Sequence, residues 1–533
     1  MNPITVYISK YKKAILACFV YRNKKKKIMK KNFILLASVA IALCTSCKKD
    51  EQTEQEVIVA DVELANEVNE FIWKGMNAWY LWQNEVPVLA DNRFIDNNEF
   101  YTYLNGFSEP RDLYNAVQSS KDRFSGIVDD YDILFNSFAG VAKTTGVEYS
   151  LTRPPEGGTS VVGVVRYIIN GSDAAAKGIQ RGDIFYAVNG TPLFAETNAD
   201  GRITNSNLNL LSADTYTLNF ATISNGSTTP NDVNISLTQQ ELTENPIHIS
   251  KIIETGGKKI GYIMYNSFTS NFDDELNTAF LEFKNANIDE LVLDLRYNLG
   301  GSVTSSTRLA SMITGQFNGQ LFSKEKWNGK WTRLLGSDNA FVSRIDNDLI
   351  NSVGMTRVFV IATDDSASAS ELLINGLTPY INVVHIGDVT VGKNEFSITL
   401  LDNPNQQADL TDGSKISFPY ANFFSTTLQN ANKNHKYALQ PLVGTNENAA
   451  GFSEFTTGLV PDFSQPESLG NLGQLGEINE PLLAVAIAQI TGATGKSFLT
   501  PVAENLKIKT ISSSNSLKPY RDVMLQDTEI KFK

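Results

Sequence analysis

Three serines alternate with alanines in the segment S-A-S-A-S-E, at positions 366, 368 and 370. The segment follows the apolar run Val358–Ala362 and precedes Leu372 and Leu373, so we expect it to join a strand to a helix N-terminus. Free amides at such a terminus favour negative charge on a nearby hydroxyl, as a nucleophile requires. A helix cap explains one serine, but only one residue occupies a cap position. By local chemistry alone, the three serines are equivalent candidates.

Two further segments have side chains or backbone groups suited to the same chemistry. Lys393 follows a glycine in an apolar neighbourhood, and burial would lower the pKa of its amine so that it accepts a proton from a serine. An ordinary solvated lysine is the alternative. Gly300 and Gly301 follow the apolar strand Glu290–Leu295 and can direct backbone N–H groups at a developing oxyanion. A tight structural turn explains the glycines equally well.

Composition excludes several other kinds of chemistry. The 533-residue chain has a net charge of −12, which argues against a nucleic-acid partner. Its three cysteines all lie within the first 47 residues, so the folded body has no disulfide, thiolate metal site or cysteine nucleophile. Three histidines make a histidine-rich metal centre improbable. We therefore predict no metal and no cofactor.

The elements that must position these groups form an α/β core. We expect strands at Lys259–Tyr265, Glu290–Leu295, Val358–Ala362 and Val383–Gly387, and helices at Asp273–Asn285 and Glu480–Ile490. Helical periodicity over Asp61–Trp82 predicts a mainly helical leading domain, with the aromatic run at Trp79–Trp82 packed inside it. Strands and helices in alternation are typical of a sheet covered by helices.

Residues from about 139 to 243 have short β-rich runs, including Tyr149–Leu151 and Ser160–Ile169. The stretch G-S-D-A-A-A-K-G-I-Q-R-G-D-I-F-Y-A-V-N-G, residues 171–190, predicts a short helix, a Gly178 stop, two turns and a strand. It resembles PDZ domains of the permuted kind found in bacterial proteases. Such modules bind an extended peptide as an added strand, and here the binding loop would lie near Thr145 and Gly146.

The whole pattern resembles the C-terminal processing, or tail-specific, family of Ser/Lys peptidases. The matching segments are the PDZ-like stretch, L-D-L-R-Y-N-L-G-G, S-A-S-A-S-E, V-G-K and G-L-V-P-D at residues 458–462. The resemblance implies a multidomain α+β protein: a leading helical domain, a permuted PDZ β-domain and an α/β (ClpP/crotonase-like) serine protease core. It also implies a serine endopeptidase that cleaves proteins or peptides and engages their C-termini through the PDZ domain.

The family's spacing between nucleophile and base selects one serine. In this family the base lysine lies 25 residues after the middle serine, and Lys393 follows Ser368 by 25 residues. The implied oxyanion donors are the backbone N–H of Ala369 and of Gly300 or Gly301. Many relatives have Gln four residues past the lysine, whereas this chain has Ser397, which we expect either to orient Lys393 or to be plainly structural. Some also have Asp where this chain has Pro379.

The N-terminus is predicted to be an export signal. From Met29 a basic start and an apolar run lead to small residues before Cys47, which resembles a bacterial lipoprotein signal with lipid attached at Cys47. Met1 or Met29 is then the start, and the protein is expected to be lipid-anchored to an envelope membrane, on the periplasmic side or outer surface. The predicted divisions are a leader 1–47, linker 48–65, helical domain 66–138, PDZ-like domain 139–243, protease domain 244–495 and C-terminal tail 496–533.

Two alternatives remain open from the sequence. His385 in its apolar strand would serve as the base of a Ser/His hydrolase, although a core histidine is the more ordinary interpretation. The second alternative is a catalytically inactive PDZ-containing lipoprotein that binds peptides. Retention of both Ser368 and Lys393 argues against it, because an inactive site has no chemical reason to keep either.

Overall fold

The computed structural model describes residues 61–224, 226–335, 338–403, 407–409, 415–417, 431–492, 499, 501–517 and 524–527. The predicted leader and Cys47 lie outside the described residues. Within the described ranges, every helix is too short or too polar to cross a membrane.

The leading segment is mainly helical, as predicted. Its α-helices are α2 (Glu67–Trp79), α3 (Asn97–Leu104), α4 (Pro110–Ala116) and α5 (Tyr131–Phe138), with 3-10 turns at Gln83–Glu85 and Pro87–Leu89 and a short strand β1 (Gly126–Val128). The first helix is shorter than the predicted 61–82. It begins after Asn66 because the Asn66 side chain accepts the backbone N–H of Val68, and it ends where Tyr80 becomes extended. Leu64 and Trp82 pack on the core although neither is helical, which is why the apolar pattern predicted a helix longer than the observed one.

The aromatic run packs against another part of the chain, not inside a small helical domain. Trp79 is fully buried and stacks on Trp331, with ring centroids 4.6 Å apart. Trp331 Nε1 donates to the carbonyl of Ala78 at 2.7 Å, and Asn328 Nδ2 donates to the carbonyls of Ala78 and Tyr80. The leading helices therefore share one hydrophobic core with the later α/β region.

The β-rich region forms a sheet in the order β10-β9-β5-β4-β3-β29, with its own core. Its elements are β3 (Val147–Thr152), β4 (Val162–Ile168), α6 (Asp173–Ala176), β5 (Ile184–Val188), β6 (Thr191–Pro192), β7 (Ala195–Thr197), β8 (Ile203–Ser206), the 3-10 turn Leu208–Ser212, β9 (Thr215–Ser224) and β10 (Ser227–Thr238). β2 (Val141–Thr144) pairs with β11 (Gln240–Thr243) where the chain enters and leaves. The last strand of the sheet, β29 (Ser512–Ser513), comes from the end of the chain.

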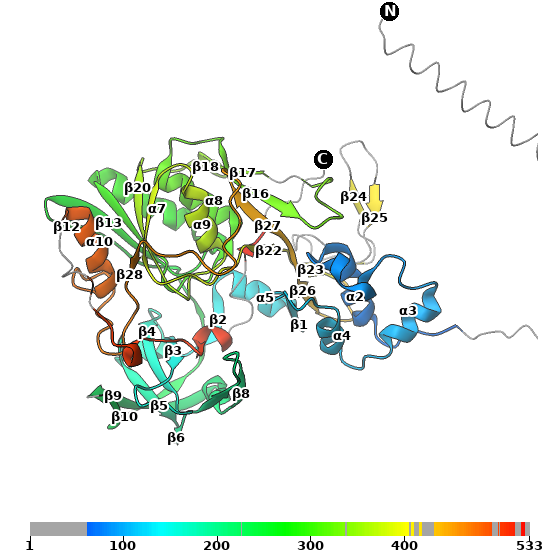
Figure 1. The fold of residues 1–533 in the computed structure, drawn as a ribbon, viewed down its shortest axis with the longest axis horizontal. Helices are drawn as coiled ribbons and strands as arrows, with labels where there is room; N and C mark the ends of the chain where they lie inside the picture. Colours follow the sequence, from blue (N-terminus) through cyan, green and yellow to red (C-terminus); the bar gives the residue numbers. More distant parts are fainter. Residues whose placement is uncertain are drawn as a thin grey trace, which may run out of the picture. The chain divides into compact units, whose positions relative to one another are not determined.

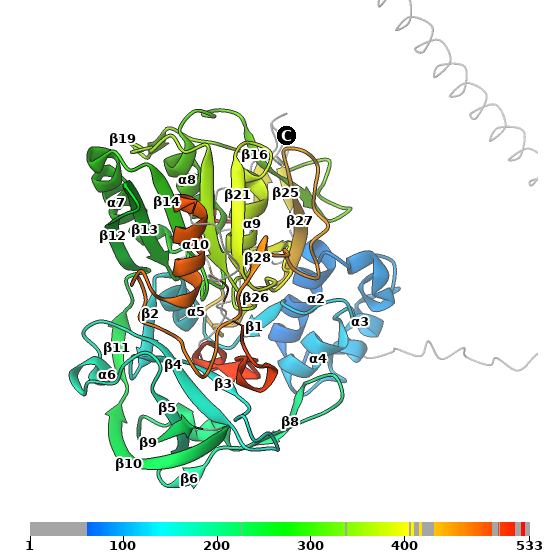
Figure 2. The same cartoon turned by 60° about the vertical axis from the view of Figure 1, so that its left-hand side comes forward.

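The α/β core is a six-stranded sheet in the order β12-β13-β14-β20-β21-β28 (Figures 1 and 2). The strands are β12 (Ile247–Thr255), β13 (Lys258–Tyr265), β14 (Glu290–Asp294), β20 (Arg357–Ala362), β21 (Asn382–Gly387) and β28 (Phe463–Ser464), all parallel except β12. Leu291 and Leu293 pack with α7 (Asp273–Ala286), α8 (Val303–Thr314) and α9 (Ala369–Leu377). Val292 faces α10 (Pro481–Thr491) on the other side. This burial on both faces explains why the three central residues of β14, Leu291–Leu293, are all apolar.

A second six-stranded sheet has the order β15-β30-β22-β27-β16-β17. Its strands are β15 (Gly301–Ser302), β30 (Met524–Leu525), β22 (Glu395–Ser397), β27 (Leu442–Asn448), β16 (Leu321–Trp327) and β17 (Asp338–Ala340). The remaining short elements are β18 (Arg344–Ile345), β19 (Asp348–Leu349), β23 (Leu400–Leu401), β24 (Gln407–Asp409), β25 (Lys415–Ser417), β26 (Ala438–Gln440) and 3-10 turns at Ser270–Phe272, Glu504–Leu506 and Ser514–Leu517.

The prediction of a simple tail at 496–533 is wrong for the residues described there. Ser512–Ser513 extend the β-domain sheet, and Met524–Leu525 lie inside the second sheet. Backbone pairing to distant strands orders these polar residues, and such pairing leaves no periodic signal in the sequence.

The shared core predicts a stability effect from the first helix. Trp79→Ala removes a fully buried, stacked indole, and we expect a loss of about 3–5 kcal/mol in the free energy of unfolding, measured by chemical denaturation. Ile95→Ala, at a 92% exposed position, is the control and should change stability by less than ~0.5 kcal/mol. Equal stability of the two variants would contradict the shared core.

Candidate active site

Ser368 lies where β20 leads into α9, and its hydroxyl is the uncommitted one of the three alternating serines. Ser366 Oγ donates to the carbonyl of Leu295 at 2.8 Å, and Ser370 Oγ donates to the carbonyl of Asn298 at 2.8 Å. Ser368 Oγ is buried and has no hydrogen-bond partner among the described residues. The structure therefore distinguishes serines that the local sequence left equivalent.

The backbone at Ser368 is held in a rarely occupied conformation. Its φ is +65° and ψ −115°, in a region that favours glycine. Such a conformation costs about 1–3 kcal/mol and persists only where its surroundings enforce it. The next residue, Ala369, opens α9, and an amide at this first position has no acceptor within its own helix.

One carboxylate, that of Glu371, enforces this conformation and ties Ser368 to Lys393. Glu371 Oε2 accepts the backbone N–H of Ser368 and the backbone N–H of Lys393, each at 2.8 Å. Glu371 Oε1 accepts the N–H of Gly392 at 2.7 Å and the hydroxyl of Thr390. Burial raises the pKa of the Glu371 carboxyl, and these four hydrogen bonds oppose the rise. The sequence pattern indicated no role for Glu371, although this residue ends the S-A-S-A-S-E motif.

Lys393 is fully buried, and the leading segment forms part of its surroundings. Lys393 Nζ lies 4.8 Å from the centroid of the Phe124 ring, on the ring face. The neighbouring Arg123 donates to the carbonyl of Gly392 and packs its guanidinium on the same ring. These contacts span about half of the chain, so neither Arg123 nor Phe124 was predicted.

The glycine pair lies at the start of β15 and is bonded to the nucleophile segment through Asn298. Asn298 Oδ1 accepts the N–H of Gly300 at 2.9 Å, while the Asn298 carbonyl accepts the N–H of Ala367. Gly301 has φ +131°, and a Cβ there would lie 2.2 Å from the carbonyl oxygen of Phe268. Because the Gly300 N–H is already engaged, Gly301 is the better candidate for an oxyanion donor.

A buried charge cluster fixes the strand end that precedes the glycines. Arg296 is fully buried and bonds Asp294 and Glu480 through paired N–H groups. Arg181, from the β-domain, bonds Glu467 at 2.6 Å. Burial alone would raise the pKa of Glu467, but Arg181 and Arg296 lower it to about 2.

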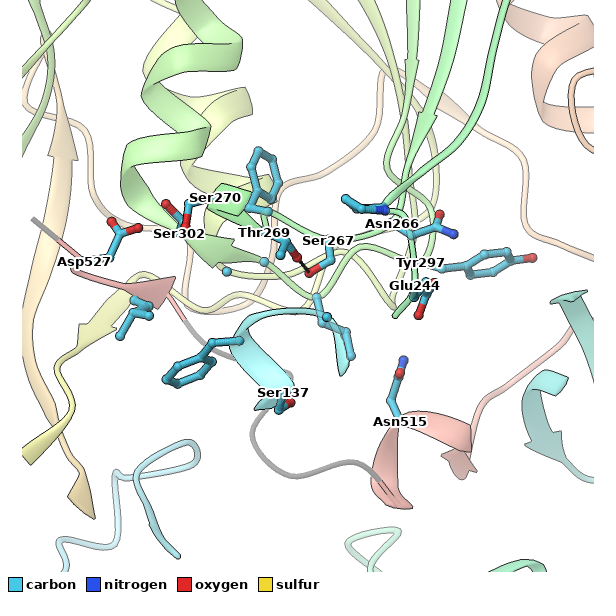
Figure 3. A pocket seen from close by; sticks show the side chains of 18 residues that line it. Ser137, Glu244, Asn266, Ser267, Thr269, Ser270, Tyr297, Ser302, Asn515 and Asp527 are labelled. Carbon is cyan, nitrogen blue, oxygen red and sulfur yellow. Dashed lines mark hydrogen bonds between the residues drawn. The ribbon is translucent and has the colours of Figure 1, made fainter. Parts of the chain in front are cut away.

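A solvent-open pocket borders the glycine pair (Figure 3). Its cavity volume is about 110 Å³, and it is lined by Gly300, Gly301 and Ser302, by the segment Asn266–Ser270, and by Leu525 and Asp527. Ser368 does not line it, and at 0% exposure its hydroxyl is closed off from solvent. The glycine pair therefore borders a pocket that is open to solvent, whereas the Ser368 hydroxyl does not.

Two other predicted residues have their side chains engaged elsewhere. Ser397 Oγ accepts from Gln440 Nε2 at 3.0 Å and donates to the carbonyl of Met524 at 3.3 Å. An orienting role for Ser397 toward Lys393 stays a prediction.

His385 is buried in β21 with Nε2 3.2 Å from the carbonyl of Ala362, and burial lowers its pKa. Among the described residues, neither Ser368 Oγ nor His385 Nδ1 has a hydrogen-bond partner, so these two atoms are not bonded to each other.

Known proteins similar to this chain are proteases. Residues 259–441 match the family described as Peptidase family S41, and residues 67–126 match the Peptidase S41 N-terminal domain. Carboxyl-terminal-processing peptidase 3, chloroplastic, of Arabidopsis thaliana is 23% identical over 73% of this chain and 72% of its own length. The carboxyl-terminal-processing protease of Picosynechococcus sp. is 24% identical over 30% of this chain and 35% of its own length. A putative S41 protease from Bacteroides fragilis superposes with a TM-score of 0.59 at 24% identity, covering 80% of this chain and 98% of that one, which shows the fold.

These matches define the protein as a serine peptidase. The chain belongs to peptidase family S41, the carboxyl-terminal-processing peptidases, as its sequence motifs predicted.

The shared carboxylate makes Glu371 a positioning residue, which leads to a test. Glu371→Gln leaves one acceptor oxygen where four donors converge, so the backbones of Ser368 and Lys393 shift. We expect kcat on an unstructured protein substrate to fall by about 10²-fold while the chain stays folded by circular dichroism. Glu290→Gln, which alters an ion pair with Arg357 away from these loops, is the control. Unchanged kcat in Glu371→Gln would contradict the role.

Proposed function

We propose that this chain is an endopeptidase in which Ser368 is the nucleophile and Lys393 is the general base. The observation that carries the proposal is that Glu371 Oε2 accepts the backbone N–H of Ser368, the serine whose hydroxyl is uncommitted, and the backbone N–H of the buried Lys393. Full burial of Lys393 disfavours its charged form, so the amine can accept a proton. The substrates are proteins or peptides, as for the family.

The proposed chemistry follows from these positions. Lys393 Nζ takes the Ser368 proton, and Ser368 Oγ attacks the peptide carbonyl to give a tetrahedral oxyanion. The N–H groups of Ala369 and Gly301 stabilise that oxyanion. Protonated Lys393 then gives its proton to the leaving amine, and water hydrolyses the acyl-enzyme by the same base.

The β-domain is proposed to act as a PDZ-like module that engages an extended segment of the substrate. Support comes from its sheet, in which β3 directly follows the predicted binding loop at Thr145 and Gly146. A pocket lined by Thr144, Thr145, Val147 and Tyr149 lies at this point. A peptide added to β3 would use main-chain hydrogen bonds for affinity and this pocket for side-chain selection.

Replacement of the nucleophile tests the proposal directly. Ser368→Ala should lower turnover of an unstructured protein by more than about 10³-fold and abolish covalent labelling by a fluorophosphonate. Ser370→Ala is the matched control, because the Asn298 carbonyl keeps its bond from Ala367. If the Ser368→Ala chain were still labelled by the fluorophosphonate, another residue would be the nucleophile.

Replacement of each candidate base separates the Ser/Lys mechanism from the Ser/His alternative. Lys393→Ala should lose turnover as Ser368→Ala does, since no other proton acceptor is proposed for Ser368. His385→Ala removes a ring bonded to a main-chain carbonyl and should keep turnover within about tenfold of the parent chain. The reverse pattern would establish His385 as the base.

Export and lipid attachment at Cys47 complete the proposal and rest on the signal-like sequence that precedes this residue. In cells fed an alkyne-tagged fatty acid, the parent chain should carry the tag and fractionate with membranes. Cys47→Ser should lose both properties, whereas Cys44→Ser should keep them. Tag retained in Cys47→Ser would contradict the assigned attachment site.

A further inference from the structure

Residues 512–514 lie along the β3 edge of the β-domain sheet. Ser512 and Ser513 pair antiparallel with Leu151 and Ser150 of β3, and Ser514 Oγ accepts the N–H of Tyr149 at 3.1 Å. Ser514 also lines the pocket beside Thr145. The segment thus takes the edge, direction and pocket that an added peptide strand would take on β3.

A second part of the same segment lies between the two strands that bear the catalytic elements. Met524 pairs with Gly301 of β15, and Leu525 pairs both with Ser302 of β15 and with Ser397 of β22. β15 contains the proposed oxyanion glycine, and β22 begins two residues after Lys393. A peptide whose carbonyl is to reach both groups must run between these strands, and β30 already occupies that gap.

Side-chain contacts show that this gap is shaped for an extended peptide. The Met524 side chain is fully buried, and Asn446 Nδ2 lies 2.7 Å from its sulfur. The Gln526 N–H donates to the carbonyl of Ser397 at 3.0 Å. Asp527 Oδ1 accepts the hydroxyl of Thr304 at 2.7 Å and its N–H at 3.3 Å, near the N-terminus of α8. The gap therefore holds one apolar side chain, main-chain partners and one carboxylate.

The burial of the Ser368 hydroxyl agrees with β30 lying in the gap between β15 and β22. Ser368 Oγ is shielded from solvent, and the pocket beside the glycines is bounded by Leu525 and Asp527 of the same segment. An active peptidase must admit a polypeptide to Ser368, so residues that shield Ser368 from solvent must move. β30 is only two residues long. It pairs with two residues of β15 and with Ser397 of β22, and a few side-chain contacts of Met524 and Asp527 add to these pairings, so we expect it to open more readily than the longer strands around it.

We propose that the chain's own residues 512–514 and 524–527 occupy the two peptide-binding edges of the enzyme, β3 and the β15–β22 gap respectively, and that substrates bind by displacing them. The ligand class is an extended polypeptide that places an apolar side chain where Met524 lies and an acidic group near Thr304. The proposal rests on the proposed function. It adds where the substrate strand runs and what keeps the site closed.

Two truncations and a pair of point variants test it in the otherwise full chain. A chain ending at Leu517 lacks β30, and a chain ending at Thr510 lacks β29 as well. Met524→Lys places a charge in the buried position and should expel β30, whereas Met524→Leu keeps the burial and is the matched control. The readouts are the fluorophosphonate labelling rate of Ser368 and kcat and KM on an unstructured protein.

We expect the Leu517 truncation and Met524→Lys to label Ser368 at least about tenfold faster than the parent chain and Met524→Leu. The Thr510 truncation should lower KM further by freeing β3. A synthetic peptide of residues 518–533 should inhibit the Leu517 truncation competitively. If the Leu517 truncation fails to fold by circular dichroism, the comparison of Met524→Lys with Met524→Leu decides.

Equal labelling in the parent chain, the Leu517 truncation and Met524→Lys would overturn the occupancy while leaving the Ser368 assignment intact. Slower labelling in Met524→Lys or the folded truncation would also overturn it, because β30 would then support the site instead of closing it. Absence of Ser368 labelling in every variant would instead refute the proposed function.

Discussion

The Glu371 carboxylate is the group on which the arrangement of the site depends. Two loops that follow different strands of the sheet, one after β20 and one after β21, end in backbone N–H groups directed at its two oxygens. Burial disfavours the ionised carboxyl, and the converging donors compensate for that cost. Through these bonds Ser368 keeps its glycine-like backbone conformation and Lys393 keeps its place in the core.

Other buried polar groups extend this constraint to the oxyanion side. Asn298 joins the glycine turn to the nucleophile segment, and the cluster around Arg296 fixes the strand that leads into that turn. The leading segment adds Arg123 and Phe124 against the lysine loop. Three distant parts of the chain thus contact the loops of the candidate site, and the leading helices share a hydrophobic core with the α/β region that bears these loops.

The sequence predicted the four inner strands of the α/β core, β13, β14, β20 and β21, because each contains a short apolar run that is largely buried. The predicted strand Glu290–Leu295 and the observed β14, Glu290–Asp294, differ by one residue. The helix after S-A-S-A-S-E and the helix that begins at Pro481 also lie where the pattern placed them. Local periodicity suffices for such elements, since burial of one face or both faces determines their composition.

The rest could not be predicted because it depends on contacts between residues distant in the chain. Nothing in the residues around Phe124 indicates a buried lysine 269 positions later. Ser512–Ser513 and Met524–Leu525 are too short to show strand periodicity, and pairing with distant strands places each of them in a sheet. The spacing that selected Ser368 came from family resemblance. In the structure, the hydroxyls of Ser366 and Ser370 donate to main-chain carbonyls and the hydroxyl of Ser368 does not, which also sets Ser368 apart.

The most direct measurement is a crystal structure of the enzyme trapped with a peptide aldehyde or boronate. The account predicts a covalent bond from Ser368 Oγ and the adduct oxygen within about 3 Å of the Ala369 and Gly301 nitrogens. Lys393 Nζ should lie within hydrogen-bonding distance of Ser368 Oγ, and the peptide should replace β30 between β15 and β22. An adduct on another residue, or one whose serine is bonded to a base other than Lys393, would contradict the central claim.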